Sequence, residues 1–119
     1  MKTCNRYVIL SHDHPTPHFD FMLEKEGVLE TWRLNLLPGT SPFLAEKMHD
    51  HRLEYLDYEG PVSNDRGFVK RMDKGTYKII ADTESFFIVH LSGGKYQGQI
   101  NFDRMGAETL LGSFMTDTQ

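Results

Sequence analysis

The stretch Tyr96-Gln-Gly-Gln-Ile-Asn-Phe-Asp103 decides the fold class of this 119-residue chain. Tyr96, Gly98, Ile100 and Phe102 share one parity, and a polar residue follows each of them. Successive side chains of a β-strand point to opposite faces, so this alternation predicts a half-buried strand. We therefore expect a sheet to build at least part of the core.

Short strand patterns of this kind continue in both directions along the chain. Strands are expected at 7–10, 18–23, 28–36, 67–72, 75–81, 85–91, 97–105 and 109–115. The run 43–48 fits either a strand or a helical turn, whereas Glu26-Gly27 and Ser92-Gly93-Gly94 are typical of turns between strands. Many short strands with close turns predict a mainly β fold, a small barrel or a sandwich with few short helices.

Length and composition favour a single globular domain over residues 1–119. Hydrophobic residues make up 39% and charged residues 25% of the chain, and no repeat or linker divides it. No apolar run approaches the roughly 20 residues that span a membrane. The apolar run 7–10 is also too short for a signal peptide. We expect a cytoplasmic protein with no membrane attachment.

The net charge of −4 bears on the partners of the protein. Broad attachment to duplex DNA needs a basic face that neutralises several phosphates, and this composition argues against it. A site that binds one phosphate through a metal ion is still compatible with this net charge, because a divalent cation is a large local positive charge. With six histidines and one cysteine, Cys4, such a site would use imidazole and carboxylate ligands, which suit Zn, Mn or Fe.

The first concentration of ligand-type residues is SHDHPTPHFDFML, residues 11–23. His18 and Asp20 are two apart on an expected strand, so both side chains leave the same face while Phe19 points into a core. His12 precedes a Pro-Thr-Pro turn that would fold it back over that face as a third ligand. Histidines on half-exposed strands are more often inert surface residues, so spacing alone leaves a metal site and a plain surface equally open.

The second concentration is HDHRLEYLDYEG, residues 49–60. If this segment forms a strand beside the first, His51 faces the same pocket. Tyr55 and Tyr58 fit core or rim aromatics equally well. Asp50, flanked by histidines, is typical of a turn. Trp32 is expected to anchor the core rather than to stack on a base.

The order of these segments resembles the 3′-phosphoesterase domain family of bacterial DNA ligase D. The string YVILSHDHPTPHFDFMLEKEGVLETW, residues 7–32, is similar to the opening of that domain, and residues 49–60 are similar to its second motif. The strings GTYKII (75–80) and FFIVHLSGGKYQGQINFDRM (86–105) are similar to its closing strands. The similarity runs from Arg6 to about Phe114, so the chain looks like a stand-alone homologue.

The resemblance implies a small β-barrel with a metal pocket at one end. It implies a manganese-dependent enzyme that removes a 3′-phosphate or a terminal ribonucleotide from DNA or DNA/RNA primer ends, with Zn²⁺ or Co²⁺ as other possible metals. By the same resemblance, His12, His18 and Asp20 match the metal ligands, and His51 and Tyr55 match residues that contact phosphate during catalysis. A DNA ligase or polymerase is the implied partner in repair.

Three positions depart from the family pattern. Met22 stands where the family usually has an arginine, and a thioether cannot form a guanidinium's bidentate phosphate contacts. The segment 33–38 replaces the family's Ala-Val-Pro-Lys-Gly-Pro and so lacks its lysine, and His49 replaces a commonly acidic residue. Three arginines are candidates to supply the missing charge from another strand: Arg33, Arg52 and Arg71.

Two alternative readings remain open at this point. A cupin-like jelly roll would bind iron through a His-x-His step, His12 and His14, with Glu24 and His51 as further ligands. His14 separates the two enzyme readings, because it has no role in the phosphoesterase reading. The other alternative is a non-catalytic member of the same family, without the arginine, that binds DNA ends or a repair partner.

Overall fold

The computed structural model describes residues 5–39 and 41–117, so Cys4 lies outside the described residues. Within these residues the chain forms strands and one short 3-10 helix. They are β1 (Arg6–His12), β2 (His18–Lys25), β3 (Val28–Leu34), β4 (Phe43–Lys47), η1 (Leu53–Leu56), β5 (Gly60–Pro61), β6 (Phe68–Asp82), β7 (Phe86–Gly93), β8 (Gln97–Arg104) and β9 (Thr109–Thr116). No helix of the described residues is long and apolar enough to cross a membrane.

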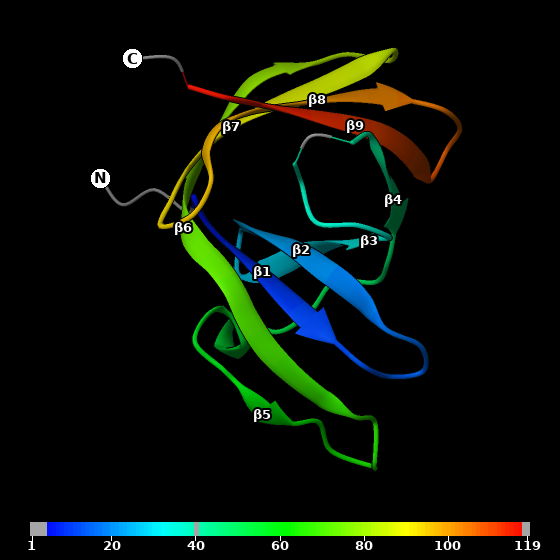
Figure 1. The fold of residues 1–119 in the computed structure, drawn as a ribbon, viewed down its shortest axis with the longest axis vertical. Helices are drawn as coiled ribbons and strands as arrows, with labels where there is room; N and C mark the ends of the chain where they lie inside the picture. The colour runs from blue at the N-terminus through cyan, green and yellow to red at the C-terminus, as the bar shows by residue number, and fades with distance from the viewer. Residues whose placement is uncertain (1–4, 40, 118–119) are drawn as a thin grey trace.

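The strands close into a barrel (Figure 1). Neighbours are antiparallel in the order β1-β2-β3-β4-β9-β8-β7-β6, and the pairing of β6 with β1 joins the two ends of this row. Strand β5 pairs with the start of β6 and lies outside the ring. The expectation of a mainly β fold with few short helices is confirmed, and of the two forms considered the chain adopts the barrel.

Strand β6 is longer than the sequence pattern indicates. The expected strands 67–72 and 75–81 form one continuous strand, whose first half pairs with β1 and whose second half pairs with β7. Gly75 lies where the partner changes, and a Cβ there would overlap the backbone of Ser92 and Gly93. The glycine therefore permits a close approach of two strands, which from sequence resembles a break between them.

The ambiguous run 43–48 is a strand, and its helical alternative is wrong. Phe43 and Ala45 are buried while Leu44 and Glu46 are exposed, which is the period of a strand. Strand β4 pairs with β3 on one side and β9 on the other, so these long-range partners decide its conformation. The turn at Glu26-Gly27 is confirmed, with φ of 47° and 88° in the left-handed region typical of two-residue hairpins.

The inner and outer faces of β1, β2 and β3 carry two separate apolar clusters. Tyr7, Ile9, Phe21, Trp32 and Leu34 belong to the cluster inside the barrel, so Trp32 is a core residue as expected. Side chains of the other parity point outward and join a second cluster. Its buried members are Val8, Leu10, Met22, Leu29, Leu56 and Val69.

The outer cluster is covered by residues 48–67, here called the cover segment. Leu56 of η1 is buried in the outer cluster, and Leu53, Tyr55, Tyr58 and Val62 pack against it. This segment runs across the outside of the barrel below β1 in Figure 1. A pocket can therefore form between the barrel wall and the cover segment rather than inside the barrel.

A buried carboxylate fixes the turn between β7 and β8. Asp73 accepts hydrogen bonds from the Tyr7 hydroxyl at 2.5 Å and from the backbone N–H groups of Lys95 and Tyr96 at 2.7 and 3.1 Å. Burial, followed by the hydrogen bond to Asp73, raises the pKa of Tyr7. The residues after Gly93 are thus held by a polar network beside the core, which is a structural role.

Candidate metal centre

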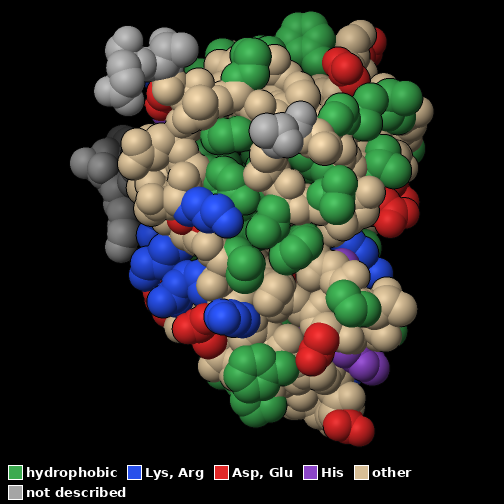
Figure 2. Space-filling model, in the orientation of Figure 1, with side chains coloured by type: hydrophobic (Ala, Val, Ile, Leu, Met, Phe, Trp, Pro, Cys, Tyr) green, Lys and Arg blue, Asp and Glu red, His purple; other side chains and the backbone are tan. Residues whose placement is uncertain are grey.

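His12, His18 and Asp20 meet at one end of the β1–β2 hairpin. His12 ends β1 and pairs with His18, the first residue of β2, while Asp20 follows two residues later on the same outward face. The hairpin register therefore brings the two imidazoles together, and the strand period adds the carboxylate. One ligand atom from each residue lies within 4.8 Å of the others. In Figure 2 histidine side chains lie along the edge on the side of this hairpin.

Backbone carbonyls set the tautomers of both imidazoles. Since a carbonyl only accepts, His18 must donate Nδ1–H to the oxygen of Thr16 at 2.8 Å, and His12 must donate Nε2–H to the oxygen of Arg66 at 2.8 Å. The remaining nitrogens face Asp20. His18 Nε2 lies 3.2 Å from Oδ1 of Asp20, and His12 Nδ1 lies 3.5 Å from its Oδ2.

This arrangement fits a divalent metal ion. His18 Nε2 is buried and has no hydrogen-bond partner among the described residues, although a carboxylate oxygen lies beside it. In the neutral rings two nitrogen lone pairs and a carboxylate converge, and a cation between them would satisfy all three. Two imidazoles oriented by backbone carbonyls, with one carboxylate, are a ligand set used for Zn, Mn and Fe.

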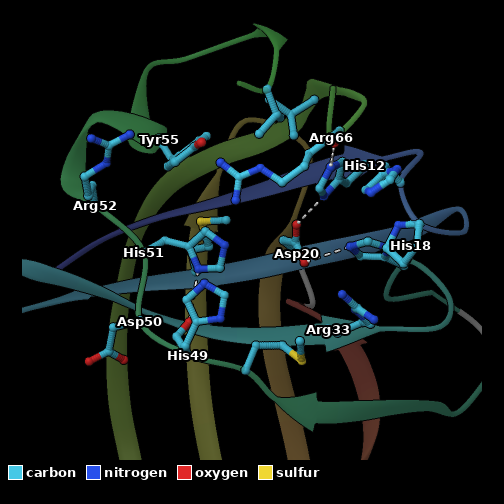
Figure 3. Close-up of a pocket in the computed structure, with 16 residues that line it drawn as sticks. His12, His18, Asp20, Arg33, His49, Asp50, His51, Arg52, Tyr55 and Arg66 are labelled. Atoms are coloured by element: carbon cyan, nitrogen blue, oxygen red, sulfur yellow. Dashed lines mark hydrogen bonds and ion pairs between the residues drawn. The ribbon is translucent and has the colours of Figure 1, made fainter. Parts of the chain in front are cut away.

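A pocket of about 440 Å³ lies between these residues and the cover segment (Figure 3). Five histidines, three arginines and two aspartates line it. The arginines alone outnumber the aspartates, so the pocket is positive in a chain whose net charge is −4. His51 and Tyr55 line the same pocket as the three candidate ligands. It opens on the outer wall of the barrel, whereas the family resemblance implied a pocket at one end.

His51 reaches the pocket from the cover segment. It is joined to β3 by an isolated bridge with Leu29 rather than by a strand, and η1 follows. Its Nδ1 lies 2.9 Å from Thr31 Oγ1 and 3.1 Å from the carbonyl of His49. Thr31 gives its own hydrogen to the Leu29 carbonyl, so His51 donates Nδ1–H and keeps Nε2 for the pocket. Burial lowers the pKa of His51.

The two tyrosines of the cover segment differ in their contacts. Tyr55 lies on η1 with its ring edge-on to His51, at 5.8 Å between centroids. Its hydroxyl makes no hydrogen bond with a described residue. Tyr58 instead donates its hydroxyl to the carbonyl of Pro61 and packs against the outer cluster. Tyr58 is therefore a packing residue, and Tyr55 is the one with a free hydroxyl at the pocket.

The candidates for a compensating positive charge fall in different places. Arg33 and Arg52 line the pocket, and Arg71 does not. Met22 lies on the pocket floor, 1% exposed within the outer cluster. Arg66 also lines the pocket and was missed from the sequence. Its carbonyl holds His12, and a main-chain contact of this kind leaves no signal in residue type.

The cupin-like ligand set is not brought together. His14 lines the pocket, but it is not among the residues whose ligand atoms converge. The Glu24 carboxylate is engaged by Arg6, with hydrogen bonds of 3.0 and 3.1 Å. The strand order is also a row of neighbours closed on itself, not a jelly roll of two sheets. The iron-binding alternative is therefore wrong in its ligands and in its fold.

Asp13 has a structural role in the loop beside the centre. Its Oδ1 accepts the backbone N–H of Phe68 at 2.8 Å, which ties the loop after β1 to the start of β6, directly after the cover segment. Gly67 lies between these groups with a φ of 86°, and a Cβ there would overlap Asp13 and His14. The neighbouring carbonyl, that of Arg66, is thereby placed against His12.

An antiparallel barrel with two imidazoles and a carboxylate converging in a positive pocket on its outer wall defines a class: small barrel proteins with a candidate metal centre. Residues 10–114 match the family model described as the DNA Ligase D 3′-phosphoesterase domain. The chain belongs to this family.

Similar proteins described as LigD come from several bacteria. The chain is 37% identical over 121 residues to "Multifunctional non-homologous end joining protein LigD" of Mycobacterium bovis, and the match covers 90% of this chain and 15% of the relative. A Mycobacterium tuberculosis protein, "Multifunctional non-homologous end joining DNA repair protein LigD", gives the same values. The Pseudomonas aeruginosa LigD protein is 34% identical over 83 residues, covering 65% of this chain and 10% of the relative. The chain thus spans a small fraction of the length of these relatives.

Proposed function

We propose that this protein is a manganese-dependent 3′-phosphoesterase that removes a 3′-phosphate or a terminal ribonucleotide from DNA ends. The observation that carries the proposal is the convergence of His12, His18 and Asp20, with both free imidazole nitrogens directed at the carboxylate. Family membership supports the reaction class. We assign these three residues as the metal ligands, for Mn²⁺ or for Zn²⁺ or Co²⁺.

In this proposal the ligand residues hold the metal ion, and the arginines of the pocket attract the phosphate. The chemistry that a bound divalent ion supplies is polarisation of a phosphoryl oxygen and a lowered pKa of water. The Thr16 and Arg66 carbonyls hold the two imidazoles in the tautomers that leave their lone pairs free. The arginines around the pocket attract an anionic phosphate into a chain of negative net charge.

His51 and Tyr55 are the proposed catalytic residues that contact phosphate. The lowered pKa of His51 makes its neutral form the resting state at neutral pH. An anion in the pocket favours the protonated form, so Nε2 takes a proton from solvent as phosphate binds. Nε2–H then donates to a phosphate oxygen or to the leaving oxygen. The Tyr55 hydroxyl donates a further hydrogen bond that orients the group.

A second candidate function is non-catalytic binding of DNA ends or of a repair partner. The observation in its favour is Met22, which is uncharged and buried at a position where the family usually has an arginine. Such a protein would bind metal and phosphate without turnover. The end-healing assay below separates the two functions.

The biological setting follows from the relatives. Their printed names place them in non-homologous end joining, so DNA or DNA/RNA primer 3′ ends are the proposed substrates. A DNA ligase or polymerase acting on the same ends is the proposed partner, and the cytoplasm is the proposed location. Residues 1–119 are proposed to act as one 3′-phosphoesterase-like domain.

The test is an end-healing assay on two duplex primers, one ending in a 3′-phosphate and one in a single ribonucleotide. Each is incubated with the protein, with and without manganese, beside His18→Ala and His51→Gln. Trimming that needs manganese and is lost in both variants supports the enzyme. Metal and phosphate binding without trimming of either primer would instead establish the non-catalytic function.

A further inference from the structure

Arg33 is half-buried on β3, on the outward face that carries the candidate metal centre. It is paired in register with Asp20 on β2 and with Glu46 on β4. Directly opposite residues of neighbouring strands point to the same face of the sheet, so Arg33 projects beside Asp20. Figure 3 shows Arg33 on the strand next to Asp20 and His18, within the same pocket.

The Arg33 guanidinium has no hydrogen-bond acceptor among the residues that the structure describes. Its Nε is buried and makes no hydrogen bond, and no ion pair joins it to Asp20, to Glu46 or to another described residue. A buried donor without a partner costs free energy, because its bond to water is lost and not replaced. An oxygen ligand that entered the pocket would remove this cost.

The other arginines of the pocket are already engaged. Arg52 is exposed and pairs with Glu54 at 3.5 Å. Arg66 donates from Nε and Nη2 to the carbonyl and hydroxyl of Ser63, at 2.8 and 3.1 Å. Among the lining arginines, Arg33 alone makes no side-chain hydrogen bond or ion pair with a described residue. It is also the one placed directly across from a candidate metal ligand.

Strand β2 offers no positively charged side chain that could bind an anion beside Asp20. The residue on the same face two positions after Asp20 is Met22, buried and apolar. Thr31 lies two positions before Arg33 on the same face of β3, and its hydroxyl is hydrogen-bonded to His51. The positively charged side chain beside the Asp20 carboxylate is therefore Arg33 of β3, on the β4 side of the pocket. His51 approaches from the cover segment.

We propose that Arg33 is the phosphate-binding arginine of this site, whose guanidinium holds the non-bridging oxygens of a phosphoryl group placed at the His12–His18–Asp20 centre. This inference rests on the proposed function for the identity of the ligand. A guanidinium matches a phosphate with two parallel N–H···O bonds, and such charge-assisted pairs are stronger than neutral ones. Phosphate would thus be held between Arg33 and His51.

The test measures binding separately from turnover. Inorganic phosphate is titrated calorimetrically into the manganese-loaded protein, into Arg33→Met and into Arg71→Met. Arg71 is the matched control because it is also a half-buried arginine of the barrel wall but does not line the pocket. Manganese affinity and the thermal midpoint are measured for each protein.

The expected result is a loss of phosphate affinity of about 10- to 100-fold in Arg33→Met, as for a removed hydrogen bond to a charged group. Manganese affinity should stay unchanged. If Arg33 had only a structural role, its replacement would disturb the metal centre and change manganese affinity as well. Equal phosphate binding by Arg33→Met and the unaltered protein would overturn the proposal, as would an equal loss in Arg71→Met.

Two further results keep the outcome decisive. If Arg33→Met does not fold, Arg33→Lys keeps the charge and loses the planar fork, and its phosphate affinity should fall by about 10-fold; unchanged affinity would overturn the assignment. If the protein binds phosphate through Arg33 but trims no 3′ end, the proposed function fails and the assignment of Arg33 stands.

Discussion

His18 Nε2 lies 3.2 Å from Oδ1 of Asp20 while the hydrogen of the ring is on the opposite nitrogen, donated to the carbonyl of Thr16. In the neutral ring two hydrogen-bond acceptors therefore face each other in a buried position. The same relationship holds for His12 on the other side of the carboxylate. This arrangement is the geometric basis for the proposed metal site, because a cation between these atoms would satisfy all of them.

His18→Ala should abolish metal binding and leave the barrel folded. It removes one of three converging ligands, so the loss of affinity should exceed the roughly 10- to 100-fold typical of outer partners of a metal site. Visible absorption of bound Co²⁺ and the thermal midpoint measure the two effects. His90→Ala is the control, because His90 lies on β7 and pairs with Asp117. Retained Co²⁺ binding in His18→Ala would contradict the assigned centre.

Asp20→Asn should stabilise the metal-free protein while it weakens metal binding. In the assigned tautomers the imidazole nitrogens that face Asp20 carry no hydrogen, and the amide nitrogen of an asparagine would donate a hydrogen bond to one of them. We expect a gain of about 1 kcal/mol in the free energy of unfolding, the usual net value of a hydrogen bond. Urea unfolding in the presence of a chelator measures it. A variant less stable than the unaltered protein would contradict the assigned tautomers.

Gly67→Ala should weaken metal binding through the backbone. A residue other than glycine at a φ of 86° costs about 1–2 kcal/mol, and its Cβ would also push on Asp13 and His14. The Arg66 carbonyl that orients His12 would shift, so Co²⁺ affinity should fall by about 10-fold. Gly106→Ala is the matched control, since a Cβ at Gly106 meets nothing within 4 Å. Equal affinities in the two variants would contradict the role of this loop.

The lowered pKa of His51 should appear in the pH dependence of stability. The unfolded chain takes up a proton on this residue near pH 6.5, whereas the folded protein does so only at lower pH. Stability is therefore fully present above pH 6.5 and falls as the pH drops below it. His51→Gln should show a shallower loss of thermal midpoint between pH 7 and pH 5, in metal-free protein. A steeper loss in the variant would reverse the sign and refute the buried neutral imidazole.

Local patterns allowed much of the barrel to be predicted. The alternation in β8 and β2 and the turn at Glu26-Gly27 arise from neighbouring residues, which a sequence displays directly. Strand β4 and the unbroken β6 depend on partners far along the chain. From the sequence, Gly75 looked like a break between two strands. Its role is to allow β7 to approach closely, and this role depends on a strand that is distant in the sequence.

The convergence of the three candidate ligands was predictable from the sequence, whereas the surroundings of the site were not. His18 and Asp20 share a strand, so the period of two places them together, and the hairpin register adds His12. His51 reaches the pocket through a single bridge to Leu29, which no periodicity encodes. The carbonyl of Arg66 contributes without its side chain, so residue identity could not reveal it.

Strands β1, β2 and β3 hold the fold together with one set of side chains and carry the candidate chemistry with the other. Mutations can therefore change the outward side chains without disturbing the inward side chains that form the core. A lineage could lose or relocate a charge on the outward set and still produce a molecule that folds, and Met22 with Arg33 is consistent with such a history. The same separation makes the barrel a scaffold for engineering, in which a few outward positions can be randomised to select new reactions without redesigning the interior.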